Sequence, residues 1–419
     1  MPHLVGDLQT CAVKGHCIQQ NLWLMRDLTD FVIERDLPCA LVSLDQQKAF
    51  DMVDRGFLMN VLETFQLHPN FRKWISVLYE ESFSSVIVNG FCSEVFNVER
   101  GVRQGCPLSP LLYVLFSESL SRLLERDSRL VPFVVPGGAK VKCAQYADDV
   151  TCVVSSLGSF RALSQDLSIF ERATGAKLNP EKTKGLRLGS WRYRDLPFGA
   201  SWSDQNIKIN GIWFGYDAPC DVTWNERAEV FESRLETFGT RWLSILGKVT
   251  VVNRFVSPIL WYPGAVYPIP RRVLVRLERA IFSFIWSGGT ELVKRAVMYQ
   301  KLEKGGLGVV HLGSKLTCLL FKQLFVAVTD PGLPCSYFVR FWGGLHLRRW
   351  VPALFSNREP HSSTPNRVVR VICSALIELP PVDLSQPALV HSSLRDRALN
   401  AIFYRDVILS KYGVRCIQG

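Results

Sequence analysis

The clearest hydrophobic pattern in the chain lies in Lys140–Ser155, where two apolar, β-branched runs flank an Asp148-Asp149 pair. This pattern predicts a strand, a tight turn and a second strand. A further apolar run, Cys39–Leu44, predicts a buried strand that ends at Asp45. The pattern therefore places aspartates directly at the ends of predicted buried strands.

Helical and strand patterns alternate irregularly over the first 217 residues. A β-hairpin is predicted at Ser84–Val98, where an Asn-Gly pair suits a type I′ turn, and Ile207–Gly215 is a second hairpin candidate. We expect an α+β domain with an antiparallel sheet over residues 1–217. Apolar residues recur at helical spacing in Asn21–Arg35, Phe57–Leu67, Phe71–Glu80, Leu111–Arg126 and Phe160–Ala173.

The pattern changes beyond residue 217, where helical spacing dominates. We expect residues 218–300 to form a helical second domain, whose first helix has Thr223 as its candidate N-cap. Residues 301–419 are broken by prolines, and we expect a mostly helical C-terminal region of unknown role. The helices predicted beyond residue 217 are Trp224–Phe238, Trp242–Trp261, Arg271–Trp286, Phe321–Val328 and Ser393–Leu409.

Composition indicates a globular protein with a basic surface. Hydrophobic residues make up 47% of the chain, which is too many for a disordered protein. The net charge of +11 suits a polyanionic partner such as nucleic acid, although a moderately basic surface would also account for it. The 12 cysteines are scattered without a Cys-x-x-Cys pair, which favours buried reduced thiols over disulfides or a zinc site.

No targeting segment is visible in the sequence. The N-terminus lacks the charged and apolar regions of a signal peptide. The apolar window Val249–Pro270 contains Arg254 and several prolines, which argues against a membrane span. We expect an intracellular protein without a membrane partner, in either the nucleus or the cytoplasm, with an undetermined oligomeric state.

One glycine-containing loop is a candidate for phosphate binding, and a second one only resembles such a loop. Arg100–Pro110 combines two glycines and Arg103 with the start of a predicted helix, where backbone N–H groups attract anions. A rigid connection between elements is the alternative. Lys304–Lys315 superficially resembles a P-loop, but Ser314 precedes Lys315 in the reverse of the required order, so we interpret it as a glycine-rich turn.

The aspartates suggest metal chemistry. Adjacent carboxylates between apolar runs repel each other, and a divalent cation such as Mg²⁺ would relieve that repulsion. Two such ions about 3.5–4 Å apart are the centre of two-metal phosphoryl transfer. The alternative is a solvated Asp148-Asp149 turn and a solvated strand-end Asp45.

Several motifs together resemble one family. Leu44–Asp51, Arg100–Pro110 and Tyr146–Asp149 are followed by Asn179–Thr183, Trp213–Gly215 and Gly305–Gly308. In this order and spacing the chain resembles the reverse transcriptases of non-LTR (LINE-type) retrotransposons over roughly residues 1 to 315.

The resemblance implies a right-hand polymerase with fingers and palm to about residue 217 and then a helical thumb. It implies an RNA-directed DNA polymerase that adds dNTPs to the 3′-OH of a DNA primer on an RNA template. Asp45 and Asp148 would hold two Mg²⁺ ions, with Mn²⁺ as a substitute, and Asp149 would complete the carboxylate cluster.

The resemblance also implies binding residues. Phe50 matches a steric gate that would exclude a ribose 2′-OH, Gln104 and Gly105 would contact the incoming nucleotide, and Lys182 could approach the departing pyrophosphate.

For the template and primer, the resemblance implies Arg103 and a primer grip at Trp213, Phe214 and Gly215. Ordinary core packing is the alternative for Phe50, Trp213 and Phe214.

The chain departs from the family at Lys14–Cys17, where a Pro-Gly-Arg-Ser-like stretch is usual. Upstream fingers elements, an endonuclease and a Cys/His-rich tail are not visible, so we expect an N-terminally truncated fragment. Two alternatives to an active enzyme stay open, namely a catalytically inactive relic that binds nucleic acid and a pseudogene product that does not fold.

Overall fold

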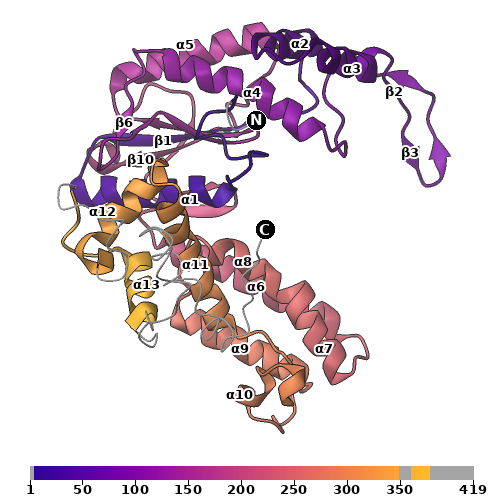
Figure 1. Cartoon of the computed structure of the whole chain (residues 1–419), viewed down its shortest axis with the longest axis vertical. Helices are drawn as coiled ribbons and strands as arrows, with labels where there is room; N and C mark the ends of the chain where they lie inside the picture. Colours follow the sequence, from indigo (N-terminus) through magenta and orange to yellow (C-terminus); the bar gives the residue numbers. More distant parts are fainter. Residues whose placement is uncertain (1–3, 349–359, 378–419) are drawn as a thin grey trace, which may run out of the picture. The chain divides into compact units, whose positions relative to one another are not determined.

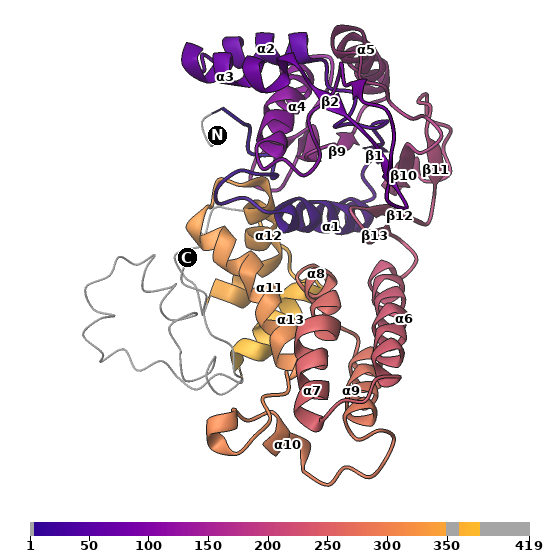
Figure 2. The ribbon, with the colours of Figure 1, turned by 90° about the vertical axis from the view of Figure 1, so that its right-hand side faces the viewer.

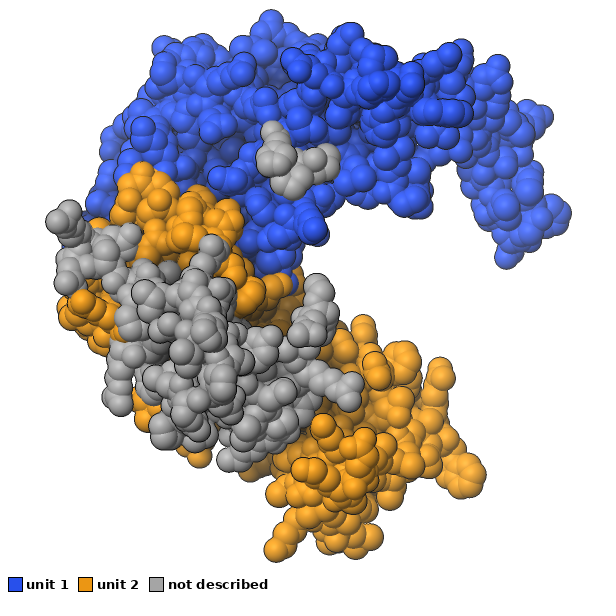
Figure 3. All heavy atoms as spheres, in the orientation of Figure 1, with its two compact units in different colours: residues 1–21, 29–134, 140–210 blue, residues 22–28, 135–139, 211–419 orange. Residues whose placement is uncertain are grey.

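The computed structural model describes residues 4–348 and 360–377, which divide into two compact units. Figure 3 shows the first unit, residues 1–21, 29–134 and 140–210, in blue, and the second, residues 22–28, 135–139 and 211–419, in orange. The predicted domain boundaries at residues 217 and 300 stay predictions. The helix predicted at Ser393–Leu409 lies outside the described residues.

A five-stranded sheet forms the centre of the first unit, in the order β11-β10-β1-β9-β8. All neighbours are antiparallel except β10 and β11, so the predicted antiparallel sheet is confirmed in the main. The central strand β1 is apolar on both faces, and residues 39–42 have no exposed surface. The strands are β1 (Cys39–Leu44), β8 (Cys143–Tyr146), β9 (Asp149–Val154), β10 (Lys184–Leu188) and β11 (Ser201–Ser203).

Helices cover one face of this sheet. α4 and α5 lie over the sheet, and α2 and α3 continue beside them (Figures 1 and 2). The ring of Phe116 on α4 lies 5.6 Å from that of Phe57 and 5.9 Å from that of Phe170, which ties three helices into one core. The helices are α2 (Arg55–Thr64), α3 (Pro69–Glu80), α4 (Ser109–Arg126) and α5 (Leu157–Thr174), each within a few residues of its prediction.

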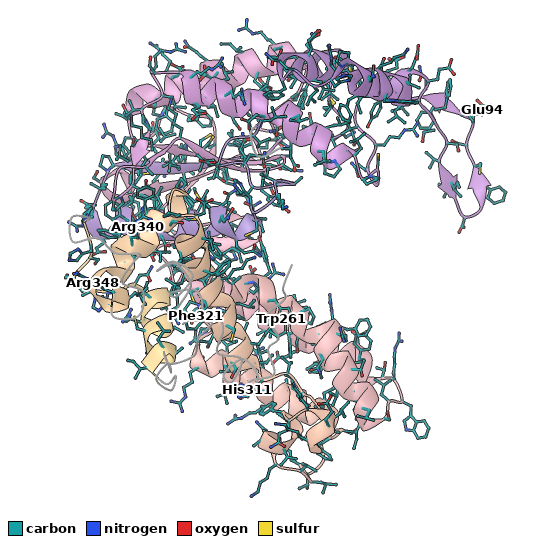
Figure 4. All side chains as sticks on the ribbon, viewed as in Figure 1. Glu94, Trp261, His311, Phe321, Arg340 and Arg348 are labelled. Atoms are coloured by element: carbon teal, nitrogen blue, oxygen red, sulfur yellow. The ribbon has the colours of Figure 1, made fainter. Side chains whose placement is uncertain are left out.

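Three short strand pairs complete the first unit. The predicted type I′ hairpin is present, with φ of 54° at Asn89 and 87° at Gly90. Its side chains are apolar and exposed, and Glu94 (labelled in Figure 4) is the one charged residue between residues 83 and 97. The pairs are β2 (Phe83–Ser84) with β5 (Phe96–Asn97), β3 (Ile87–Val88) with β4 (Phe91–Cys92), and β6 (Phe133–Val134) with β7 (Lys140–Val141).

The boundary between the units falls inside two local elements. α1 (Ile18–Arg35) contributes residues to both units. The strands β12 (Asn206–Ile209) and β13 (Ile212–Gly215) flank the turn at which the last segment of the second unit begins. A 3₁₀ turn, η1 (Gly189–Trp191), follows β10 in the first unit.

The described residues of the second unit beyond residue 218 form helices and connecting turns without strands. α6 packs against α9, and α11 packs against α12 and α13. His311 caps α11, because its ring accepts a hydrogen bond from the Ser314 N–H at 3.2 Å (Figure 4). The elements are α6 (Pro219–Gly239), α7 (Ile245–Val251), η2 (Val252–Val256), η3 (Ser257–Leu260), α8 (Trp261–Gly264), α9 (Arg271–Ile285), α10 (Arg295–Met298), η4 (Leu302–Lys304), α11 (Leu312–Thr329), α12 (Pro334–Arg348, kinked at Gly344) and α13 (Arg367–Ile377).

Two helix predictions in the second unit are wrong in detail. α6 begins at Pro219, because a first-turn proline needs no N–H partner, so Thr223 lies inside the helix. The Thr223 hydroxyl instead accepts a hydrogen bond from the Trp213 N–H at 3.2 Å. The helix predicted over Trp242–Trp261 is divided into α7, a π turn and a 3₁₀ turn, and Pro258, which has no N–H, lies at the break.

A buried polar network lies inside the second unit. Arg26 is 3% exposed and donates two hydrogen bonds to Asp27 at 2.8 and 2.9 Å. Gln323 of α11 accepts from Arg26 at 2.7 Å and donates to Asp27 at 2.8 Å. Asn366 donates to Oδ1 of Asp27 at 3.1 Å, whereas the bond from Gln323 goes to Oδ2. Each carboxylate oxygen therefore has partners, as a buried charge requires.

Among the residues that the structure describes, one helix is long and apolar enough to cross a membrane by length and composition alone. This is α11, with a mean hydropathy of 1.3 over 18 residues; it begins at Leu312, well before the helix predicted at Phe321–Val328. It packs against α8, α9, α12 and α13 within the second unit, which is the position of a core helix.

Two neighbouring carboxylates, Asp127 and Asp166 of α5, have pKa values that are shifted in opposite directions. The Arg129 guanidinium donates hydrogen bonds of 2.7 and 3.0 Å to the two carboxylate oxygens of Asp127 and holds the pKa of that carboxyl at about 2. Asp166 is 2% exposed, and one of its oxygens has no hydrogen-bond partner. Burial and the neighbouring charge of Asp127 raise the pKa of Asp166 to about 6.

We predict that Asp166→Asn stabilises the protein in a pH-dependent way. Because the folded chain holds the Asp166 proton more tightly than the unfolded chain, stability falls as pH rises from about 4 to about 6. The variant should raise the free energy of unfolding by about 1–3 kcal/mol at pH 7.5 and far less at pH 4. Urea unfolding at both pH values measures this, with the exposed Asp195→Asn as control. An equal effect of Asp166→Asn at both values would contradict the prediction.

Candidate active site

The strand register brings three aspartates to one end of the sheet. Leu44 of β1 pairs with Val150 of β9, so Asp45, the next residue along, comes level with Asp149 at the start of β9. Tyr146 pairs with Asp149 across the β8–β9 hairpin, which leaves Ala147 and Asp148 in the turn. Residues that are about a hundred positions apart in the sequence are therefore brought to the same end of the sheet.

The three carboxylates influence one another electrostatically. Partial burial, then Asp148 and then Asp45 raise the pKa of Asp149 to about 6. Partial burial and, more weakly, Asp45 also raise the pKa of Asp148. A cation held between these side chains would favour their ionised forms and relieve the repulsion.

The donor set fits a hard divalent cation. Carboxylate oxygens are the ligands that Mg²⁺ takes in proteins, and the three side chains come from the end of β1, the β8–β9 turn and the start of β9. Among the described residues, no group of three or more His, Cys, Asp or Glu is already arranged as a metal site. The strand register and the effect of the Asp45 charge on the pKa of Asp148 and Asp149 indicate that the three carboxylates lie at the same end of the sheet.

Asn210 is a site residue that the sequence analysis missed. Its side-chain amide donates a hydrogen bond of 2.7 Å to one oxygen of Asp149 and lowers the pKa of that carboxyl against the other effects. It has a φ of 47° in the turn after β12. The Asn-Gly pair indicated a turn, but nothing local could indicate a partner 61 positions away.

The Phe50 side chain packs against α4. Its ring stacks on Tyr113 of α4, with centroids 4.3 Å apart and planes 16° apart. The buried Tyr113 hydroxyl donates to the Gln46 side chain at 2.9 Å. The predicted steric gate is therefore half-buried and supported on one side by an aromatic ring.

The loop Arg100–Pro110 runs against the segment that follows Asp45. The N–H of Gly101 bonds to the Val53 carbonyl and that of Val102 to the Phe50 carbonyl, both at 2.9 Å. Gly101 has a φ of 85°, and a Cβ there would lie 2.9 Å from the Cα of Asp51. A glycine at this position thus lets two predicted motifs meet backbone to backbone.

The residues of this loop that are predicted to contact the nucleotide (Gln104, Gly105) and the template or primer (Arg103) face solvent. Arg103, Gln104 and Gly105 are all exposed, and Gln104 donates to the Asp51 carboxylate at 3.2 Å. Their position on a loop bonded to the Phe50 segment agrees with the expected grouping, whereas their contact with a nucleotide stays a prediction.

Lys182 also lies on a loop bonded to the strand that ends at Asp45. The Asn179 N–H donates to the Asp45 carbonyl, and the Gln47 N–H donates to the Lys177 carbonyl, each at 2.8 Å. Lys182 itself is exposed. Its predicted contact with pyrophosphate stays a prediction.

The predicted primer grip, Trp213–Gly215, lies near the start of the last segment of the second unit. The Trp213 indole donates to Glu226 at 2.8 Å, and the Tyr267 hydroxyl donates to the Trp213 carbonyl at 2.8 Å. Phe214 is 1% exposed and packs near the Tyr267 ring, and Gly215 is also buried. The Phe214 ring is thus a core side chain, so any contact with primer at that residue would involve its backbone.

Comparisons with known proteins agree with these motifs. Residues 4–214 match the family described as "Reverse transcriptase (RNA-dependent DNA polymerase)". The "Transposon TX1 uncharacterized 149 kDa protein" of Xenopus laevis is 30% identical over 75% of this chain and 24% of its own length. The "Retrovirus-related Pol polyprotein from type-1 retrotransposable element R2" of Popillia japonica is 24% identical over 68% of this chain and 48% of its own length.

A further relative is the "RNA-directed DNA polymerase from mobile element jockey" of Drosophila funebris, 26% identical over 57% of this chain and 27% of its own length. The chain spans about a quarter to a half of the length of these relatives. A solved structure of Candida tropicalis telomerase with a fragment of telomeric RNA is 12% identical, covering 74% of this chain and 51% of the telomerase chain. Its TM-score is 0.39, which does not by itself establish a common fold.

We predict that Gly101→Ala destabilises the protein more than Gly90→Ala, although the two glycines have a similar φ. Gly90 has a φ of 87° and no atom within 4 Å of the place that a Cβ would take, so Gly90→Ala meets only the left-handed strain of about 1–2 kcal/mol. Gly101→Ala meets that strain and the Asp51 backbone, and should lower the free energy of unfolding by about 2–4 kcal/mol. Urea unfolding of both variants measures the difference, and equal losses would contradict the close approach.

Proposed function

We propose that this chain, which belongs to the reverse transcriptase family, extends a DNA primer on an RNA template. Its relatives belong to non-LTR retrotransposons. The observation that carries the proposal is the meeting of Asp45, Asp148 and Asp149 at one sheet end within the matched region. The reaction is nucleotidyl transfer from a dNTP to the primer 3′-OH, with release of pyrophosphate.

Asp45, Asp148 and Asp149 would hold two divalent cations, Mg²⁺ or Mn²⁺. When bound, such ions activate the 3′-OH and neutralise charge on the leaving pyrophosphate. The chain's part is to hold the carboxylates in place, and Asn210 does so for Asp149 through its hydrogen bond of 2.7 Å. Burial that raises the pKa of two of these carboxyls also strengthens their attraction for a cation.

The nucleotide would lie over the loop surface beside the carboxylates. Phe50 would stand against the 2′ position of the sugar, held by the Tyr113 ring behind it. Gln104 and Gly105 would lie along the base and template, and Lys182 would approach the pyrophosphate from the loop bonded to Asp45.

Template and primer would bind mainly through charge. The net charge of +11 favours a polyanionic partner, and Arg103 is an exposed cation on the same loop as Gln104. The backbone of Trp213, Phe214 and Gly215 would support the primer end. Binding should therefore weaken steeply as salt increases.

We predict that Asp148→Ala abolishes primer extension without abolishing nucleic-acid binding. Removing a carboxylate that holds the cations should lower single-nucleotide incorporation by at least about 10³-fold. The assay uses the purified chain with an RNA template, a DNA primer, dNTPs and Mg²⁺. The exposed Asp195→Ala of the same unit is the control and should retain full activity.

Extension that survives Asp148→Ala would refute the proposed active site. No extension by the wild-type chain, combined with salt-sensitive hybrid binding by both proteins, would instead support a nucleic-acid-binding relic of the enzyme.

We predict that Phe50→Ala relaxes the choice of sugar. Without the ring beside Tyr113, a ribose 2′-OH meets no obstacle, so the preference for dNTP over rNTP should fall by about 10-fold or more. Phe50→Tyr keeps the stacked ring and should keep the preference. The measurement is kcat/KM for a matched dNTP and rNTP pair, and an unchanged ratio in an active Phe50→Ala variant would contradict the steric role.

A further inference from the structure

The segment around Gln9 lies along the outer edge of the site's sheet, although the sequence there shows no clear pattern. The Gln145 N–H donates to the Leu8 carbonyl at 2.8 Å, and the Thr10 N–H donates to the Gln145 carbonyl at 3.0 Å. These bonds make a single parallel bridge between Gln9 and β8. The segment is thereby fixed beside the strand that leads into the turn with Asp148.

The Gln9 side chain is buried and has every hydrogen bond that an amide can make. It is 1% exposed. Its Oε1 accepts from the N–H groups of Ala147 and Cys11, each at 3.1 Å. Its Nε2 donates to the Ser117 hydroxyl and to the Gln145 Oε1, each at 3.3 Å. An amide is the side chain that offers two acceptor sites and two donors in one plane.

The bond to Ala147 acts on a strained residue next to Asp148. Ala147 has a φ of 54°, a left-handed conformation that costs a residue other than glycine about 1–2 kcal/mol. It is the first of the two turn residues between Tyr146 and Asp149, and Asp148 is the second. In so short a turn, the orientation of the Ala147 peptide decides where the Asp148 carboxylate points.

We propose that Gln9 is a positioning residue for the reaction, which holds the Ala147 peptide in its left-handed conformation and so aims Asp148 at the cation site. The proposal rests on the proposed function. A side chain without the amide would leave the buried Ala147 N–H and the partly buried Cys11 N–H without their partner and would release the turn. Gln9 itself touches neither substrate nor cation.

The chain offers a matched control in the same segment. Gln20 is also buried, at 4% exposure, and its amide accepts from the Cys17 N–H at 3.2 Å and donates to the Gly15 carbonyl at 3.3 Å. These bonds stabilise the start of α1 and do not involve the Ala147 turn. Gln9→Met and Gln20→Met therefore remove the same group from similar burial, and only the first should disturb Asp148.

The test compares both variants of the full chain in single-nucleotide extension. Gln9→Met should lower kcat by about 10–100-fold, because a displacement of about 1 Å at a reacting group has effects of this size. The KM for dNTP and the Kd for template–primer should change by less than about 3-fold, and Gln20→Met should keep kcat within about 3-fold of the wild type. Gln9→Glu keeps both acceptor sites for the Ala147 and Cys11 N–H groups and should recover part of kcat.

A second readout does not depend on activity. Mn²⁺ binding, followed by electron paramagnetic resonance without nucleic acid, should weaken in Gln9→Met and stay unchanged in Gln20→Met. If the wild-type chain binds Mn²⁺ but extends no primer, the proposed function fails while this comparison still tests Gln9.

Equal kcat and equal Mn²⁺ affinity in the two folded methionine variants would overturn the proposal. If Gln9→Met shows no cooperative thermal transition, the comparison uses Gln9→Asn against Gln20→Asn, because the shorter amide stays polar but does not reach the same N–H groups, and equal effects of that pair would overturn the proposal as well.

Discussion

The antiparallel register between β1 and β9 holds three mutually repelling carboxylates at one end of a sheet, and the rest of the site depends on it. Leu44 pairs with Val150, so a shift by one residue would separate Asp45 from Asp149 and disrupt the packing of both buried strands. The burial of β1 on both faces makes such a shift costly. Hydrophobic packing thereby maintains an arrangement that electrostatics alone would oppose.

Backbone hydrogen bonds then join two further motifs, Arg100–Pro110 and Asn179–Thr183, to the segment at the end of β1. Asn179 bonds to the Asp45 carbonyl, and Gly101 and Val102 bond to the turn that contains Phe50. These contacts involve main-chain groups, which must find partners when they are removed from water. The loops with the predicted nucleotide-binding residues are therefore attached to the strand with the first aspartate, independently of their exposed side chains.

The supporting residues come from positions without a local signal. Asn210 reaches Asp149 from a turn beyond β12, and Gln9 reaches the Ala147 peptide from a segment that the sequence analysis left without any element. Phe214 shows the reverse case, because a residue expected beside the primer has a ring that is buried in the core of its own unit. The geometry of the three aspartates therefore depends on groups that come from distant parts of the chain.

Local chemistry in the sequence determined the strands, the helices and the identity of the aspartates. The Asn89-Gly90 turn, the apolar β1 run and the Asp148-Asp149 pair could be predicted because turn geometry and burial act over a few neighbouring residues. Only the tertiary structure decided that Asn210 bonds to Asp149, that Gln9 bonds to the Ala147 N–H and that Tyr113 stacks on Phe50. Those contacts link residues 61 or more positions apart, where a single sequence contains no trace of the pairing.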